Sequence, residues 1–196
     1  MKGSPRWRAS IRRGSSAPPD PHGIFPPRRN AMVLTPRGLL FRGRCFPCSI
    51  GRGGIVKNKR EGDGGTPIGA HRVVGMLYRP DRMRAPGPWA VPIRPGDLWC
   101  DASGHPDYNH LVRAPFTESH EVLKRADRLY DLVLLTDWNW PEAVAGKGSA
   151  IFIHRWRRQG YPTEGCIALR PDHLWRLAQR LVPGTPLIVR SRPRPQ

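Results

Sequence analysis

A cysteine and a histidine near the end of the chain have the types and spacing of a nucleophile and its base. His154 ends the apolar run that begins at Ser149, and Cys166 follows twelve positions later, directly after Gly165. A thiol with an ordinary pKa of about 8.5 is little ionised at neutral pH, so a nucleophilic cysteine needs a nearby base or cation. A strand end would hold the imidazole rigidly, and the excursion is long enough to return Cys166 to its side. The pair predicts covalent acyl transfer, with Cys166 as nucleophile and His154 as general base.

Gly165 adds to this interpretation because a residue without a side chain lets a substrate approach the neighbouring sulfur. The backbone N–H groups of Gly165 and Cys166 are candidates for the oxyanion site that acyl transfer requires. The residues alone leave a second interpretation open. A single histidine and a single cysteine at this spacing also occur in proteins whose cysteine is buried and inert.

The pattern around these residues predicts a mostly β protein with two helices. Thr117 as an N-cap predicts a helix over residues 117–129. Pro171 begins a second helix that runs through residue 182. Its core-facing stripe is Leu174, Leu177, Ala178 and Leu181. Apolar runs predict one or two strands within residues 38–50, and further strands over 71–78, 131–137, 149–154 and 186–189.

The distribution of charge and proline predicts one domain with basic tails. The chain has 196 residues, 33 of them Lys or Arg, and a net charge of +18. Residues 1–30 are rich in proline and arginine without apolar periodicity, which predicts a disordered basic extension. Residues 31–190 are expected to form the catalytic domain, and residues 191–196 a basic tail.

A basic balance of this size indicates either a polyanionic partner or a solvated surface from an arginine-rich genome. The sequence has no aromatic RNA-binding motif, no zinc-finger spacing and no helix-turn-helix signature, so no nucleic-acid partner is expected. No stretch approaches the about 20 apolar residues of a membrane span. No secretory signal peptide can be identified, and translation that starts at Met32 stays an open alternative.

Two further patterns admit other chemistry. Cys45 and Cys48 have CxxC spacing, which suits a redox pair or half of a zinc site. A zinc site would need two more ligands at similar spacing, and small buried residues in a strand are the favoured interpretation. The glycine-rich segment 51–69 matches neither phosphate-binding pattern and predicts a loop. No metal or organic cofactor is predicted.

Two motifs in this order resemble the YkuD-type L,D-transpeptidase catalytic domain family. His154 followed by Thr163-Glu164-Gly165-Cys166 is similar to the family's signature, in which a histidine precedes Ser-His-Gly-Cys. Lys59 to Gly69 (KREGDGGTPIG) is similar to the family's upstream K-x-x-G-x-T-P-x-G element. The resemblance extends over residues 33–189 and implies a β-sandwich or barrel that cradles the Cys/His site.

This resemblance also implies a reaction and its substrates. Members attack the bond between the third and fourth residues of a peptidoglycan stem peptide, release D-Ala, and pass the thioester to an amine of a second stem. By position, Cys166 matches the nucleophile, His154 its base, and Gly165 the glycine beside the oxyanion site.

Two positions depart from the family pattern. Glu164 stands where many members have a second histidine, and Ala168 stands where many have Arg or Asn. Glu164 is expected either to orient His154 or bind a diaminopimelate amine, or to be a solvated loop carboxylate. Thr163, Glu164 and Arg170 are the candidate substrate-binding residues, with Arg170 among the arginines able to replace the missing donor.

Three functions remain open at this point. The first is an L,D-transpeptidase of cell-wall crosslinking. The second uses the same residues with water as acceptor, as a peptidoglycan L,D-carboxypeptidase or endopeptidase. The third is a non-catalytic basic binding module. The presumed substrate implies the cell envelope or periplasm, although a cytoplasmic location stays open, and the sequence gives no indication of oligomeric state.

Overall fold

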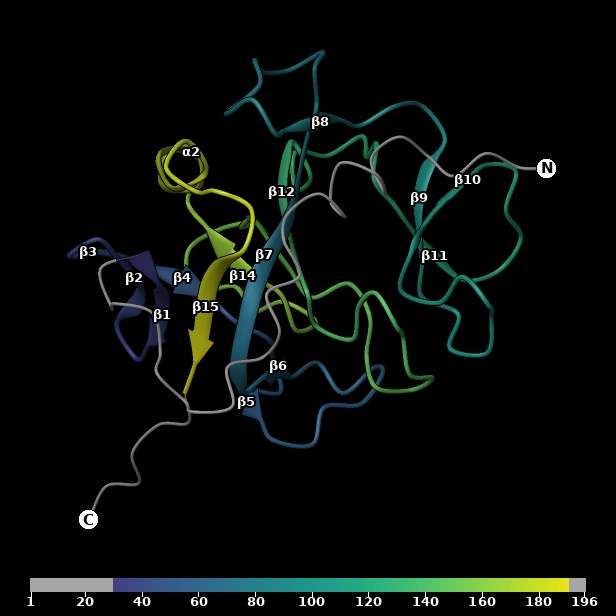
Figure 1. The fold of residues 1–196 in the computed structure, drawn as a ribbon, viewed down its shortest axis with the longest axis horizontal. Coiled ribbons are helices and arrows are strands. Elements are labelled where there is room, and N and C mark those ends of the chain that lie inside the picture. Colours follow the sequence, from purple (N-terminus) through teal and green to yellow (C-terminus); the bar gives the residue numbers. More distant parts are fainter. Residues whose placement is uncertain (1–29, 191–196) are drawn as a thin grey trace.

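The computed structural model describes residues 30–190, which form a mostly β fold with one α-helix (Figure 1). The predicted fold class is therefore confirmed, with one helix where two were expected. The basic tail at 191–196 and, apart from Asn30, the predicted N-terminal extension lie outside the described residues.

A long, curved sheet forms the centre of the molecule. In spatial order its strands run β3-β2-β1-β15-β7-β12-β13-β14-β4, and β8 pairs with β7. Only Pro47 separates the two outermost strands, β3 and β4, so the sheet nearly closes on itself like a barrel. Its strands are β1 (Met32–Thr35), β2 (Gly38–Phe41), β3 (Arg44–Phe46), β4 (Cys48–Ser49), β7 (Gly69–Tyr78), β8 (Val91–Pro92), β12 (Leu132–Thr136), β13 (Phe152–Arg155), β14 (Ile167–Leu169) and β15 (Thr185–Val189).

Most of the predicted strands are confirmed. β7 and β15 cover the runs at 71–78 and 186–189, and β12 occupies all but the two end residues of the run at 131–137. Three strands, β2 to β4, lie within 38–50, where one or two were expected. The run at 149–154 is strand only from Phe152, because Ala150 takes a positive φ of 49° that breaks the extended backbone. The favoured interpretation of the CxxC pair as buried residues is wrong for Cys45, which is exposed in β3, while Cys48 is half-buried.

The helix α2 (Pro171–Ala178) packs against one face of the main sheet and closes its apolar core. Pro171 opens it and Asp172 lies in its first turn, as helix N-termini favour. The predicted stripe is confirmed: Leu174, Leu177 and Ala178 are buried in the core cluster. Leu181 is also buried, although the helix ends three residues before it.

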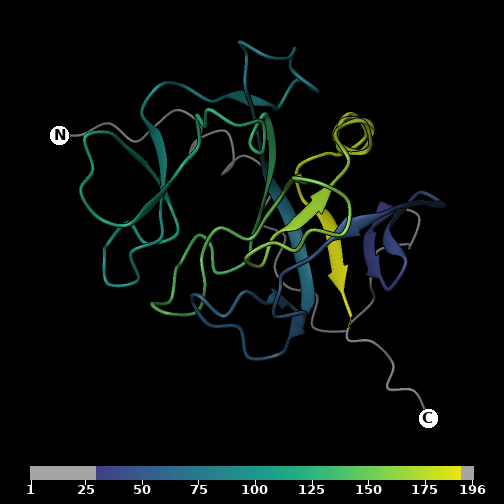
Figure 2. The same cartoon turned by 180° about the vertical axis from the view of Figure 1, so that it is seen from behind.

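Two small sheets flank the main one. β9 (Asp97–Cys100) lies between β10 (Leu111–Arg113) and β11 (His120–Val122), to one side of the main sheet in both views (Figures 1 and 2). β5 (Ile55–Val56) and β6 (Thr66–Pro67) form a parallel pair within the glycine-rich segment.

The helix α2 is too short to cross a bilayer, and no other α-helix is found in residues 30–190.

The helix predicted over residues 117–129 is wrong. Residues 120–122 form the edge strand β11, with Glu121 opposite Trp99 in the antiparallel register. Local propensity is a weak guide here, because pairing with β9 satisfies the backbone of β11, and Leu123 is fully buried in a second apolar cluster that also contains Trp99. This error matters for function, since it concealed which side chains of the segment face the site.

Candidate active site

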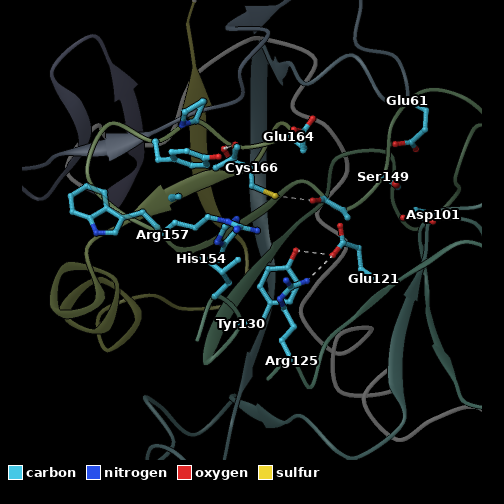
Figure 3. A pocket seen from close by; sticks show the side chains of 17 residues that line it. Glu61, Asp101, Glu121, Arg125, Tyr130, Ser149, His154, Arg157, Glu164 and Cys166 are labelled. Atoms are coloured by element: carbon cyan, nitrogen blue, oxygen red, sulfur yellow. Dashed lines mark hydrogen bonds and ion pairs between the residues drawn. The ribbon is translucent and has the colours of Figure 1, made fainter. Parts of the chain in front are cut away.

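The register between β13 and β14 brings His154 and Cys166 to one cavity. The two strands are parallel, and His154 lies beside Ala168. Cys166 precedes Ala168 by two residues, and side chains two apart on an extended chain point to the same face. Both side chains line a single cavity (Figure 3), which has a volume of about 360 Å³.

The backbone before Cys166 can only be glycine. Gly165 has a φ of +133°, a conformation that other residues rarely adopt. A Cβ at this position would lie 2.8 Å from the carbonyl oxygen of Gly65 and 3.1 Å from Ile151 Cδ1. Because Gly165 has no side chain, the turn at residues 163–166 can pack directly against the glycine-rich segment.

Thr66 joins the two sequence motifs. Its buried hydroxyl donates to the Gly165 carbonyl at 2.8 Å and accepts the Gly51 N–H at 3.0 Å. The upstream motif thus has a structural role, because it fixes the backbone beside Cys166. Asp63 supports the preceding turn by accepting from the N–H groups of Arg60 and Gly65, both at 2.7 Å.

Thr163 lines the cavity, but its hydroxyl forms hydrogen bonds within the turn at residues 163–166. It donates to the Cys166 carbonyl at 2.6 Å and accepts the Gly165 N–H at 3.2 Å. The N–H of Gly165 therefore points at Thr163. This arrangement leaves the Cys166 N–H as the backbone donor to consider for an oxyanion.

The other candidate binding residues lie in different places. Glu164 is at the exposed rim of the cavity, where it forms an ion pair with Arg52 at 2.7 Å. Arg170 is exposed, pairs with Asp172, and does not line this cavity in the described structure. Among the arginines that follow His154, Arg157 is the one that borders the cavity.

The Cys166 thiol is a buried, neutral group in this structure. Only 9% of the residue is exposed, its sulfur donates to the Ala150 carbonyl at 3.1 Å, and the Phe152 N–H donates to it at 3.4 Å. Burial raises the pKa of the Cys166 thiol to about 12, against a smaller lowering by the Phe152 N–H. The thiol is thus accessible from the cavity without being ionised.

His154 is held in the tautomer that a general base requires. Its Nδ1 lies 2.7 Å from the Arg155 carbonyl, a partner that only a protonated Nδ1 can donate to, so the lone pair is on Nε2. Burial lowers its pKa to about 4, partly opposed by this hydrogen bond. The ring of Tyr130 packs edge-on against it, with centroids 5.3 Å apart.

Charged side chains surround Cys166 in the cavity. In Figure 3 Glu61, Asp101 and Glu121 lie to the right of Cys166, with Arg125 below Glu121, and His154 and Arg157 lie to its left. The sequence analysis did not identify Asp101, Glu121, Arg125 or Tyr130. No local pattern indicated them, because His120-Glu121-Val122-Leu123 does not alternate between polar and apolar residues.

The full lining of the cavity comes from four separate regions of the chain. It consists of Glu61, Asp101, Glu121, Arg125, Leu129, Tyr130, Ser149, Ala150, His154, Trp156, Arg157, Tyr161, Pro162, Thr163, Glu164, Cys166 and Ala168. Among the residues that the structure describes, no three His, Cys, Asp or Glu side chains converge as metal ligands would.

The chain was compared with family models, solved structures and curated proteins. The family model described as the L,D-transpeptidase catalytic domain (YkuD) matches residues 24–189. A solved L,D-transpeptidase from Mycobacterium smegmatis is similar at 17% identity and a TM-score of 0.41, covering 83% of this chain. The chain spans 59% of that protein's length. The search of curated proteins gave no match.

Proposed function

The chain belongs to the YkuD family of L,D-transpeptidase catalytic domains, and from that premise we propose that it crosslinks peptidoglycan stem peptides through a thioester on Cys166. One observation carries the proposal: Cys166 and His154 line the same cavity, with the free Nε2 lone pair of His154 as the base. The proposed site of action is the cell envelope, where such peptides are found.

In the proposed first half-reaction, His154 takes the proton of the Cys166 thiol. A neutral thiol and a neutral imidazole make a pre-formed ion pair unfavourable, so the proton moves as the sulfur attacks the peptide carbonyl. The C–N bond then breaks, and His154 returns the proton to the departing D-amino acid. The Cys166 N–H is the proposed donor to the oxyanion, with Thr163 holding the turn.

The proposed site suits a charged peptide. Ala168 lies beside His154 and leaves room where a larger side chain would reduce the cavity. Arg157 and Glu164, on its rim, are the proposed partners for a substrate carboxylate and ammonium group. Glu164 already pairs with Arg52 in an exposed position, so a substrate amine would compete for it at little cost.

The experiment is acylation of the purified chain by a tetrapeptide stem, followed by intact mass. Wild type is expected to gain the acyl mass on Cys166, and Cys166→Ala is expected to gain none. Cys45→Ala is the matched control, because Cys45 is exposed and lies outside the cavity. Equal acylation of wild type and Cys166→Ala would refute the nucleophile assignment. With an acceptor stem present, crosslinked dimers support transfer, and trimmed stems alone would assign hydrolysis instead.

A further inference from the structure

Glu121 places a carboxylate in the wall of the cavity. β11 carries it, and its Oε2 accepts the Tyr130 hydroxyl at 3.1 Å. In Figure 3 the Glu121 carboxylate and the His154 ring lie on opposite sides of the Cys166 sulfur. The thioester formed on that sulfur would therefore have one base on each side.

Tyr130 fixes this carboxylate relative to the reacting residues. Its ring is buried, packs edge-on against His154, and lies 6.2 Å from the Phe152 ring. The hydrogen bond to Glu121 ties the carboxylate to that rigid group. Glu121 is thus held by the same side chain that contacts the imidazole.

Glu121 is not neutralised by its cationic neighbour. Arg125 approaches its Oε2 only to 3.9 Å, and the same guanidinium binds Asp127 with Nε and Nη2 at 2.9 and 2.7 Å. Since Asp127 holds the short contacts, the Glu121 carboxylate keeps acceptor capacity toward the cavity.

We propose that Glu121 binds the incoming acceptor ammonium group and takes its proton, while His154 serves the thiol and the leaving amine. This assignment rests on the proposed function. An alkyl ammonium group with an ordinary pKa of about 10 is almost fully protonated at neutral pH, and a protonated nitrogen cannot attack a thioester. The acceptor must therefore be bound as a cation and then lose a proton. A carboxylate on the acceptor's side of the sulfur can do both, since it attracts the cation and accepts its proton.

The step balances in atoms and charge. The acceptor R–NH3+ transfers one proton to Glu121 as its nitrogen forms a bond to the thioester carbonyl carbon. The C–S bond then breaks and Cys166 leaves as a thiolate, which receives the second nitrogen proton through His154. The products are the new amide, the free thiol and a protonated Glu121, which releases its proton to water.

The surroundings of Glu121 favour a base of this kind. Burial raises the pKa of its carboxyl, while the Tyr130 hydrogen bond and the Arg125 charge lower it and the Asp101 charge raises it. These are the charged and titratable groups that face it, with Cys166 and His154 across the cavity. A carboxylate of raised basicity accepts a proton more readily near neutral pH.

The test separates the two half-reactions in Glu121→Gln, which keeps the shape and an acceptor for Tyr130. The donor is a tetrapeptide stem, the acceptor a tripeptide stem with a free diaminopimelate amine, and both steps are followed by mass. We expect transfer to the amine to fall about 10²- to 10³-fold at pH 7, the usual scale for a general base, while acylation of Cys166 falls less than fivefold. The loss should shrink at pH 9 to 10, where the amine is unprotonated.

Glu118→Gln, an exposed carboxylate outside the cavity, is the matched control and should match wild type. Tyr130→Phe keeps the ring against His154 and loses the tether, so transfer should fall about tenfold without the pH rescue. Unchanged transfer in Glu121→Gln, or equal loss in both half-reactions, would overturn the Glu121 assignment alone. So would a wild-type acyl-enzyme that only water resolves. Absence of any wild-type acyl-enzyme would overturn the proposed function and this assignment together.

Discussion

Replacing Thr66 by Val is expected to damage both folding and the nucleophile. The two side chains have the same shape, so the change removes only the hydroxyl that links Gly51 to Gly165. Thr66 is fully buried, and the change therefore leaves one buried N–H and one buried carbonyl without partners. Each orphaned group costs about 1–3 kcal/mol, so the free energy of unfolding should fall by about 2–6 kcal/mol.

The same change should slow acylation of Cys166. Without its hydroxyl partner the Gly165 carbonyl is free to move, and a displacement of about 1 Å next to a nucleophile costs about 10²-fold in rate. Denaturant unfolding measures the first effect, and acylation by a tetrapeptide stem, followed by mass, measures the second.

Thr66→Ser is the matched control. It keeps the hydroxyl and loses one methyl group, worth about 1 kcal/mol. Two results together would contradict this reasoning: free energies of unfolding of Thr66→Val and Thr66→Ser within 1 kcal/mol of each other, and acylation rates within threefold. The Thr66 hydroxyl would then not be what holds the backbone beside Cys166.

Three further predictions concern Gly165, His154 and Cys166. Gly165→Ala should lose several kcal/mol of unfolding free energy and nearly all acylation, because its Cβ would meet the Gly65 carbonyl at 2.8 Å; a stable, active variant would contradict that geometry. Since the folded-state pKa of His154 is lowered to about 4, the unfolded chain binds a proton that the folded chain does not, and stability attributable to His154 should fall by about 3 kcal/mol as the pH drops from 6.5 to 4. His154→Gln should lack that contribution in denaturant titrations at several pH values, and parallel profiles would refute it. Alkylation of Cys166 by iodoacetamide, read by peptide mass, should rise about tenfold per pH unit from 7 to 10 because the thiol pKa is raised to about 12; a plateau near pH 7 would indicate a pre-formed thiolate.

The sequence predicts the strands and the reacting pair because both leave local signals. Apolar runs such as 131–137 and 186–189 are short, continuous and bounded by turn residues, so strand length alone identifies them. His154 at a strand end and Cys166 after a glycine are equally local. What brings them together is the parallel pairing of β13 and β14, which no local pattern specifies.

The acidic side of the cavity could not be predicted in the same way. Glu61, Asp101 and Glu121 come from three loops or edges far apart in the sequence, and only the tertiary fold places them beside one cavity. Glu121 was further concealed because the segment 117–129 has a helical composition. Its conformation is set by pairing with β9, a long-range interaction that overrides local preference.

The sequence predicts His154 as a general base but gives no indication of the protonation states of the pair. Burial moves the two pKa values apart, that of the Cys166 thiol upward and that of the His154 imidazole downward. In the resting site the thiol proton is directed at the Ala150 carbonyl. In the proposed reaction, proton transfer to His154 is therefore expected to accompany attack on the substrate, because either charge formed alone in this buried site would be poorly solvated. The same burial predicts slow alkylation and oxidation of Cys166 in the free protein, since the thiolate is the reactive form in both processes.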